Sequence, residues 1–198
     1  MKLLNILAII VIATGFAACG NSNNKQAAVT NEEAKVQAVE NKNNIEPDST
    51  GYIIRVGMQV PDITWTEANG KTVSMQELRG KVVMLQFTAS WCSVCRKEMP
   101  FIERDIWQKH KNNNDFYLVG IDRDEPLETV QEFAEKTGVT YPLALDPGAD
   151  IFAQFALRES GITRNVLVDR DGTIVMTTRL YNEEEFGRLV EKIDSMLK

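Results

Sequence analysis

The chain has 198 residues and a formal net charge of −6, with acidic and basic side chains interspersed along it. Nucleic-acid binding calls for a concentrated basic face, so this charge pattern excludes nucleic acid as an expected partner. Three cysteines are too few for a small fold stapled by several disulfides, and the fold must stand on its own hydrophobic core.

The first 18 residues are typical of a bacterial export signal. Lys2 supplies a positive start, residues 3–16 are mostly apolar, and small residues precede Cys19. This apolar stretch is shorter than the roughly 20 residues that a membrane-spanning helix needs.

A cysteine directly after Ala17-Ala18 resembles the lipobox of bacterial lipoproteins. The resemblance implies cleavage before Cys19 and acylation of that residue. Ordinary signal cleavage, with Cys19 left as a spare thiol, is the alternative.

Residues 19–50 are expected to form a disordered tether behind the acylated cysteine. Residues 20–50 contain seven asparagines and no aromatic side chain, so they cannot bury enough apolar surface to offset the entropy of ordering. Residues 51–198 are long enough for one compact domain.

Strand and helix patterns alternate along this domain. Its first half is expected to contain strands at 53–56 and 63–66, a hairpin turn at Asn69-Gly70, a capped helical turn at 74–77, a buried strand at 82–87 and a helix over 96–110.

The second half continues the pattern and ends differently. Its expected elements are a buried strand at 116–121, a helix at 126–136, a strand at 143–145, a short helix at 149–157, a hairpin of 165–169 with 173–177, and a capped helix at 182–197. This order predicts an α/β fold with a central mixed sheet, helices on both faces and an N-terminal hairpin.

The most informative motif is Cys92-Ser93-Val94-Cys95, which lies where the buried strand at 82–87 passes into a helix. At a helix N-terminus, unpaired amides and the macrodipole favour a thiolate and lower the pKa of a thiol from about 8.5. Cys92 is therefore the expected nucleophile. Cys95 lies one turn further on the same face, where it can resolve a mixed disulfide. This Cys92–Cys95 redox pair requires no other cofactor.

Several segments together resemble the TlpA/ResA-like membrane-associated thioredoxins of bacteria. They span nearly all of 51–198 and comprise Val60-Pro61-Asp62, Gly80-Lys81-Val82-Val83, Trp91 with the two cysteines, Pro100, and the run from Tyr141 to Asp146. The resemblance implies a thioredoxin-like fold and a thiol-disulfide oxidoreductase.

The same resemblance implies where the protein works and with what. It implies a lipid anchor on Cys19 in a cell-envelope membrane, with the domain facing the periplasm. The implied partners are disulfide-containing cell-envelope proteins and a membrane dithiol donor. It favours a reductant, although the residues themselves leave the direction of electron flow open.

One departure from the thioredoxin pattern concerns proton transfer. Thioredoxins keep a buried aspartate six residues before the first cysteine, and Gln86 stands there instead. Some members of the family place a glutamate in the following strand-to-helix loop, where this chain has Glu125. Glu125 is either the proton acceptor for Cys95 or a solvated carboxylate that caps the next helix.

A second departure concerns the substrate-binding loop. Thioredoxins place a cis-proline opposite the disulfide, and Thr163 stands at that position. A cis bond before a residue other than proline costs about 3 kcal/mol, so the Ile162–Thr163 bond is expected to be trans. Substrate is expected to bind as an added strand near Ile162 and Thr163. Trp91 offers it an apolar platform, or else packs against the first helix.

Other functions remain open. A thiol peroxidase of the AhpC/TSA type shares this fold, but Leu85 and Ala89 replace the Pro and Thr of the peroxidase pattern. A non-catalytic dithiol or copper-binding lipoprotein would need another soft ligand, such as Met99. No metal site is predicted, because His110 and two cysteines are one ligand short of a structural zinc site. His110 is interpreted as a solvated residue at a helix C-terminus.

Overall fold

The computed structural model describes residues 46–198, and the structural statements below concern this part of the chain. The export signal predicted at 1–18, the acylation predicted at Cys19 and most of the tether predicted at 19–50 lie outside the described residues. Within 46–198, no helix is both long and apolar enough to cross a bilayer.

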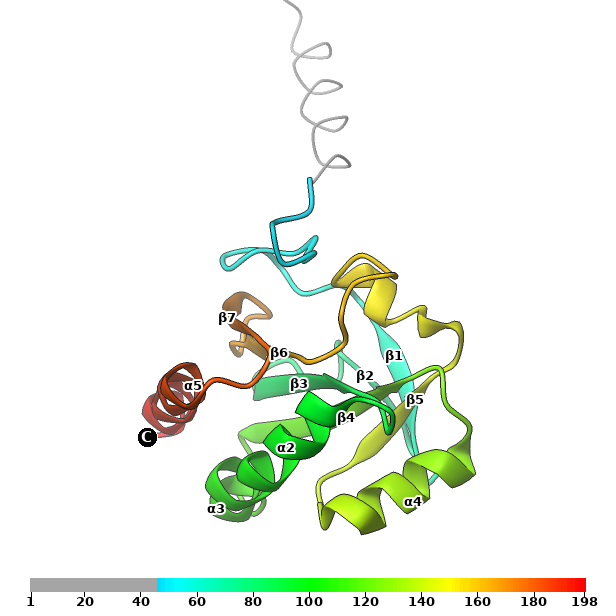
Figure 1. Cartoon of the computed structure of the whole chain (residues 1–198). Helices are drawn as coiled ribbons and strands as arrows, with labels where there is room; N and C mark the ends of the chain where they lie inside the picture. Colours follow the sequence, from blue (N-terminus) through cyan, green and yellow to red (C-terminus); the bar gives the residue numbers. More distant parts are fainter. Residues whose placement is uncertain (1–45) are drawn as a thin grey trace, which may run out of the picture. The chain divides into compact units, whose positions relative to one another are not determined.

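A seven-stranded sheet forms the centre of the domain, in the order β2-β1-β5-β4-β3-β6-β7 (Figure 1). The strands are β1 (Thr64–Glu67), β2 (Thr72–Ser74), β3 (Val82–Thr88), β4 (Phe116–Arg123), β5 (Leu143–Asp146), β6 (Arg164–Val168) and β7 (Ile174–Arg179). The helices are α2 (Ser93–Ile102), the π-helix η1 (Glu103–Trp107), α3 (Gln108–His110), α4 (Leu127–Thr137), the 3-10 helices η2 (Pro147–Ala149) and η3 (Phe152–Gln154), and α5 (Glu183–Met196).

The sheet is mixed because its connections are of two kinds. β3, β4 and β5 are parallel neighbours, and α2 and α4 make the crossovers that parallel pairing requires. β6 pairs antiparallel with both β3 and β7, and β1 and β2 form the N-terminal hairpin. The predicted fold class is therefore confirmed.

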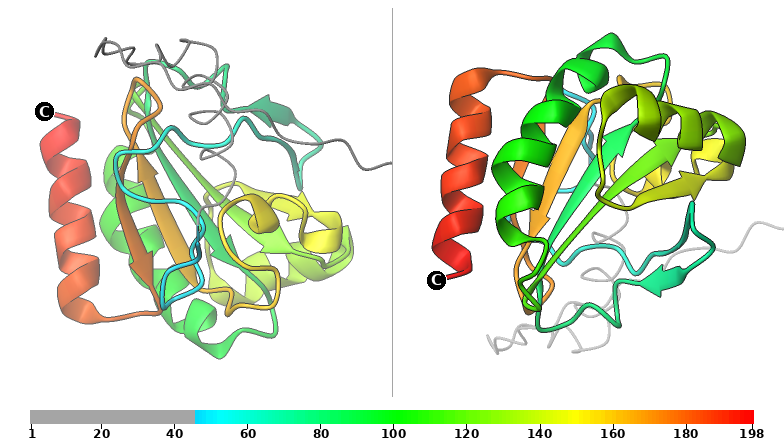
Figure 2. Two further views of the ribbon diagram at one scale, coloured as in Figure 1. Left: turned by 90° about the horizontal axis from the view of Figure 1, so that it is seen from above. Right: turned by 90° about the horizontal axis from the view of Figure 1, so that it is seen from below.

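Two apolar layers enclose the sheet. Alternate side chains of β3 point to opposite faces, with Val82 and Met84 in one layer and Val83, Leu85 and Phe87 in the other. The first layer is completed by α2, α4 and α5, whereas the second is covered by the N-terminal segment and by η2 and η3 (Figure 2). Burial on both faces explains why β3 is apolar from Val82 to Leu85 and at Phe87, with the polar Gln86 and Thr88 also buried.

The strand predicted at 53–56 is wrong. This segment lies over the sheet as a loop, and its strand-like contacts are a bridge between Tyr52 and Ala156 and a bond from Ile53 N–H to Phe155 O. Its apolar side chains are needed because Ile54 fills the core layer on that face. An apolar run that covers a sheet has the same composition as an edge strand, which is why the pattern misleads.

Two helix predictions also need correction. At 74–77 the capping box forms, with Ser74 and Glu77 exchanging hydrogen bonds, but the chain continues in turns rather than a helix. The helix predicted at 149–157 is replaced by η2, which ends at Ala149, and by η3 at Phe152–Gln154, because Gly148 and Ala149 both have positive φ and interrupt the helical path.

The helix predicted over 96–110 starts earlier and changes type. It begins at Ser93 with Cys92 as N-cap, and π-helical hydrogen bonding replaces the α pattern from Glu103. Pro100 lies inside α2, where it lacks an N–H and its ring crowds the preceding turn. Two predicted helix boundaries later in the chain are confirmed. Gly138 is the C-cap of α4, and Asn182 is the N-cap of α5.

Candidate active site

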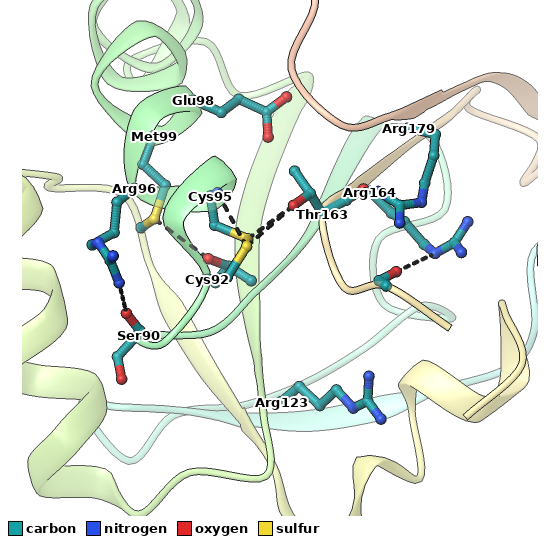
Figure 3. The surroundings of a disulfide bond; sticks show 12 residues. Ser90, Cys92, Cys95, Arg96, Glu98, Met99, Arg123, Thr163, Arg164 and Arg179 are labelled. Carbon is teal, nitrogen blue, oxygen red and sulfur yellow. Dashed lines mark hydrogen bonds between the residues drawn. A yellow bond between two sulfur atoms is a disulfide. The ribbon is translucent and has the colours of Figure 1, made fainter. Parts of the chain in front are cut away.

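Cys92 and Cys95 form a disulfide at the point where β3 gives way to α2, with their Cα atoms 5.3 Å apart (Figure 3). Cys92 is the N-cap residue, and its Sγ accepts a hydrogen bond from the Cys95 N–H at 3.2 Å. The first turn of α2 contains no acidic residue to oppose a negative charge on this sulfur. The local geometry therefore favours a thiolate at Cys92.

The two sulfurs differ in how far a partner can reach them. Cys92 is 8% exposed, whereas Cys95 is fully buried beneath it. Attack by or on another molecule is therefore possible at Cys92 and blocked at Cys95.

Thr163 lies opposite the disulfide on the loop that leads into β6 (Figure 3). Its Oγ1 is 3.2 Å from Cys92 Sγ and 3.3 Å from Cys95 Sγ. No peptide bond within 46–198 is cis, so the Ile162–Thr163 bond is trans as expected. The loop is held because the Thr163 carbonyl accepts bonds from Leu180 N–H and Arg179 Nη1.

Trp91 and Ile162 are also predicted to contact the substrate. Trp91 directly precedes Cys92 in the sequence, and Ile162 directly precedes Thr163. Trp91 is 60% exposed, which favours an apolar platform over packing against the first helix. The Ile162 side chain is buried, while its backbone N–H and C=O make no hydrogen bond to another described residue. An extended peptide could use these backbone groups for pairing.

Glu125 reaches the loop before the cysteines. Its carboxylate oxygens accept hydrogen bonds from Ser90 N–H and Ser90 Oγ, both at 2.6 Å. These bonds occupy both oxygens and tie the start of α4 to the loop that carries Cys92. Asp122 is fully buried behind them, and burial together with the Glu125 charge raises its pKa to about 8.

A buried acid that the sequence reasoning missed lies on α2 itself. Glu98 is 1% exposed, its Oε1 accepts a bond from Asn165 Nδ2 at 2.8 Å, and its Oε2 has no partner among the described residues. Burial raises its pKa from 4.5 to about 7. Glu98 follows Cys95 by three residues, so both share the buried face of the helix.

The spacing was visible in the sequence. Cys95, Glu98, Met99 and Ile102 follow the i, i+3, i+4, i+7 pattern of a buried helical face, with one carboxylate among apolar side chains. Gln86 lies near this face as a neutral polar group, and its Oε1 accepts a bond from Tyr141 Oη at 2.7 Å.

The described residues offer no group of three or more His, Cys, Asp or Glu side chains able to hold a metal ion. The solvated position expected for His110 is wrong. Its Nε2 lies 2.7 Å from Asp194 Oδ1 on α5, so His110 links two helices.

We predict that folded stability falls between about pH 4.5 and 7 because Glu98 binds its proton more tightly in the folded state. The unfolded chain releases this proton near pH 4.5, whereas the folded protein keeps it until about pH 7. Glu98→Gln removes the resulting loss, which is at most about 3 kcal/mol.

Urea unfolding of the oxidised protein across this pH range checks the prediction. The stability difference between Glu98→Gln and wild type should grow as pH rises. Glu191→Gln, which alters an exposed glutamate of α5, should show no such trend. Asp122 contributes equally to the pH dependence of stability in all three proteins, so its contribution cancels in the differences between them. A difference between Glu98→Gln and wild type that stays constant with pH would contradict the prediction.

Comparison with known proteins extends these observations. Residues 55–197 match the family model described as Redoxin. The thiol-disulfide oxidoreductase ResA of Bacillus thuringiensis (strain Al Hakam) is 30% identical over 122 residues, which cover 62% of this chain and 68% of that protein. ResA of Halalkalibacterium halodurans is 28% identical over 145 residues, covering 70% and 79%.

Solved structures of two bacterial proteins are also similar to this chain. A solution structure from Bacteroides thetaiotaomicron, described as a candidate protein disulfide isomerase, is 70% identical, covers 75% of this chain and 94% of its own, and has a TM-score of 0.74. A candidate thiol:disulfide interchange protein DsbE from Chlorobium tepidum, at 23% identity and a TM-score of 0.64, shares the fold over 73% of this chain and 99% of its own. The chain therefore belongs to the Redoxin family, as a thioredoxin-fold thiol-disulfide oxidoreductase of the TlpA/ResA-like kind.

Proposed function

We propose that this protein reduces disulfides of cell-envelope proteins, with Cys92 as nucleophile and Cys95 as resolving thiol. The observation that carries the proposal is the asymmetry of the pair. Cys92 caps a helix N-terminus and is the reachable sulfur, while Cys95 is fully buried one turn along. A nucleophile must meet its substrate, whereas a resolving thiol only has to meet the mixed disulfide.

The exchange balances in two steps. The Cys92 thiolate attacks one sulfur of a substrate disulfide, and the other substrate sulfur leaves as a thiolate that takes a proton. The Cys95 thiol then loses its proton and attacks Cys92 Sγ, forming the Cys92–Cys95 disulfide and releasing the second substrate thiol. Two electrons pass from the pair to the substrate, and a membrane dithiol donor returns them by the same chemistry.

Glu98 is the group that we assign to the proton of Cys95. It shares the buried face of α2 with Cys95, and its pKa of about 7 allows it to hold or release a proton near neutral pH. The sequence offered Glu125 either as this acceptor or as a loop carboxylate that caps the next helix. Because each Glu125 oxygen accepts a 2.6 Å hydrogen bond from Ser90, we assign Glu125 to holding the loop that carries Cys92.

The substrate is proposed to bind in an extended conformation beside the pair. The unpaired backbone groups of Ile162 support its pairing as an added strand. Thr163 would lie under the scissile disulfide, and the exposed Trp91 would cover apolar side chains of the substrate.

Anchoring by lipid on Cys19 is proposed from the residues that precede the domain. The export signal supports transfer across the membrane, and the 19–50 tether would let the domain reach substrates from a fixed lipid. The domain would then face the periplasm.

Trapping in growing cells tests the exchange. Cys95→Ala should leave Cys92 joined to partner proteins, seen as high-mass bands on non-reducing gels that dithiothreitol removes, because no thiol remains to resolve the mixed disulfide. The matched control is Cys92→Ala, which keeps the buried sulfur and should trap nothing. Equal bands from the two variants, or none from Cys95→Ala, would contradict the assignment.

Fractionation tests the anchor. The wild-type protein should incorporate a labelled fatty acid and sediment with membranes, whereas Cys19→Ala should carry no label and lose most of its membrane association, because a lipid chain supplies that affinity. Label that persists in Cys19→Ala would refute acylation at this residue.

A further inference from the structure

The Thr163 hydroxyl is the one side-chain group, within the described residues, placed at hydrogen-bond distance from both sulfurs. Its Oγ1 lies 3.2 Å from Cys92 Sγ and 3.3 Å from Cys95 Sγ, and the side chain is 2% exposed. A proline at this position, as in thioredoxins, would have no side-chain donor at all. The substitution therefore brings a donor into the redox site.

We propose that Thr163 is a catalytic hydrogen-bond donor, which stabilises negative charge first on one sulfur of the pair and then on the other. The inference rests on the proposed thiol exchange and adds a role to it. A threonine hydroxyl has one proton, so it can serve only one sulfur at a time. A thiolate is a much better acceptor than a disulfide sulfur, and the proton will therefore follow the charge.

In the reduced protein the charge sits on Cys92. Its Sγ already faces the Cys95 N–H, and the Thr163 hydroxyl supplies a second donor from the opposite side. Both donors act on the charged form, so together they increase the fraction of Cys92 that is thiolate at a given pH.

The negative charge moves to Cys95 when a donor reduces the Cys92–Cys95 disulfide again. A donor thiolate attacks Cys92 Sγ, the Cys92–Cys95 bond breaks, and its electron pair leaves on Cys95 Sγ. Thr163 Oγ1 is already within 3.3 Å of this leaving sulfur. The hydroxyl needs only to turn its hydrogen bond from Cys92 to Cys95, and the Cys95 thiolate then takes the proton that Glu98 holds and becomes a thiol. The second thiol of the donor loses its proton and attacks the donor sulfur bound to Cys92, which releases the Cys92 thiolate and leaves the donor as a disulfide.

The loop holds the hydroxyl in place beforehand. The Thr163 carbonyl is fixed by Leu180 N–H and Arg179 Nη1. Arg164, the next residue, is fully buried, lies 4.2 Å from the centre of the Tyr52 ring and donates to the Gly161 carbonyl. A β-branched side chain on so constrained a backbone has few rotamers, and a donor fixed in advance needs no reorganisation when charge develops.

The test compares threonine variants in the reduced, full-length protein. Thr163→Val keeps the shape and removes the hydroxyl, and Thr163→Ser keeps the hydroxyl. The matched control is Thr88→Val, which removes the hydroxyl of another buried threonine, one whose Oγ1 lies 3.4 Å from Met99 Sδ. The readouts are the pH dependence of alkylation at Cys92 and the rate of insulin reduction.

A hydrogen bond to a charged acceptor predicts a shift of about one pH unit, a tenfold change in the thiolate ratio. In Thr163→Val, the alkylation of Cys92 should therefore titrate about one pH unit higher than in wild type. In Thr163→Ser and Thr88→Val, it should titrate close to wild type. Below the titration midpoints of both proteins, insulin reduction should slow about threefold in Thr163→Val alone, because the greater nucleophilicity of a more basic thiolate offsets part of the tenfold loss in thiolate fraction.

The inference is overturned if the alkylation of Cys92 has the same pH dependence in Thr163→Val as in wild type. It is also overturned if Thr163→Ser shifts as far as Thr163→Val, because packing and not the hydroxyl would then be responsible. Should Thr163→Val fail to fold, Thr163→Ala compared with Thr163→Ser gives the same decision. The alkylation titration needs no substrate, so failure of the proposed reductase activity in wild type would be seen separately in the insulin assay.

Discussion

The chemistry of this protein depends on one constraint, the capping of α2 by the sulfur of Cys92. β3 is buried along its whole length, so its end at Thr88 is fixed between two apolar layers, and α2 starts shortly after it at Ser93. Cys92 is held in an extended conformation at the N-cap of α2, where its Sγ accepts a hydrogen bond from the Cys95 N–H. A negative charge placed on this atom meets the positive end of a helix.

Differences in burial give chemically similar residues different roles. Two cysteines three residues apart differ in whether a partner can reach them, because α2 turns Cys95 into the core. Two glutamates near the pair differ in the same way. Glu125 is tied to Ser90 by short hydrogen bonds, whereas Glu98 lies in the core, with a pKa near neutrality and one oxygen that has no hydrogen-bond partner within 46–198. Environment, more than residue type, sets each role.

The sequence was sufficient wherever local signals decide the structure. The redox motif, the N-terminal hairpin, the closing Gly138 and the Asn182 cap all depend on neighbours within a few residues, and these predictions match the structure. Where a residue's role depends on a partner far along the chain, prediction failed or stayed open. Glu98 is explained by Asn165, 67 residues away, and Glu125 by Ser90, 35 residues away. Composition around either glutamate carries no sign of those contacts.

Mispredicted elements have a related cause. Residues 53–56 and 149–157 both cover the same face of the sheet, where apolar side chains are needed whatever the backbone does. In the second segment, positive φ at Gly148 and Ala149 interrupts the helical path, and the Asp146 carboxylate accepts the N–H groups of Ile151 and Phe152 just after this break. Apolar composition alone cannot distinguish such covering segments from regular elements.

The central claim is that electrons pass through the Cys92–Cys95 couple, and its redox equilibrium tests this most directly. The oxidised fraction, measured by alkylation and mass spectrometry in dithiothreitol and glutathione buffers, should follow a two-electron curve in which a tenfold change of ratio takes about 30 mV. For a reductant the midpoint should lie closer to about −270 mV, as in thioredoxin, than to about −120 mV, as in DsbA. Sulfurs that remain in one state across the whole range would contradict the account.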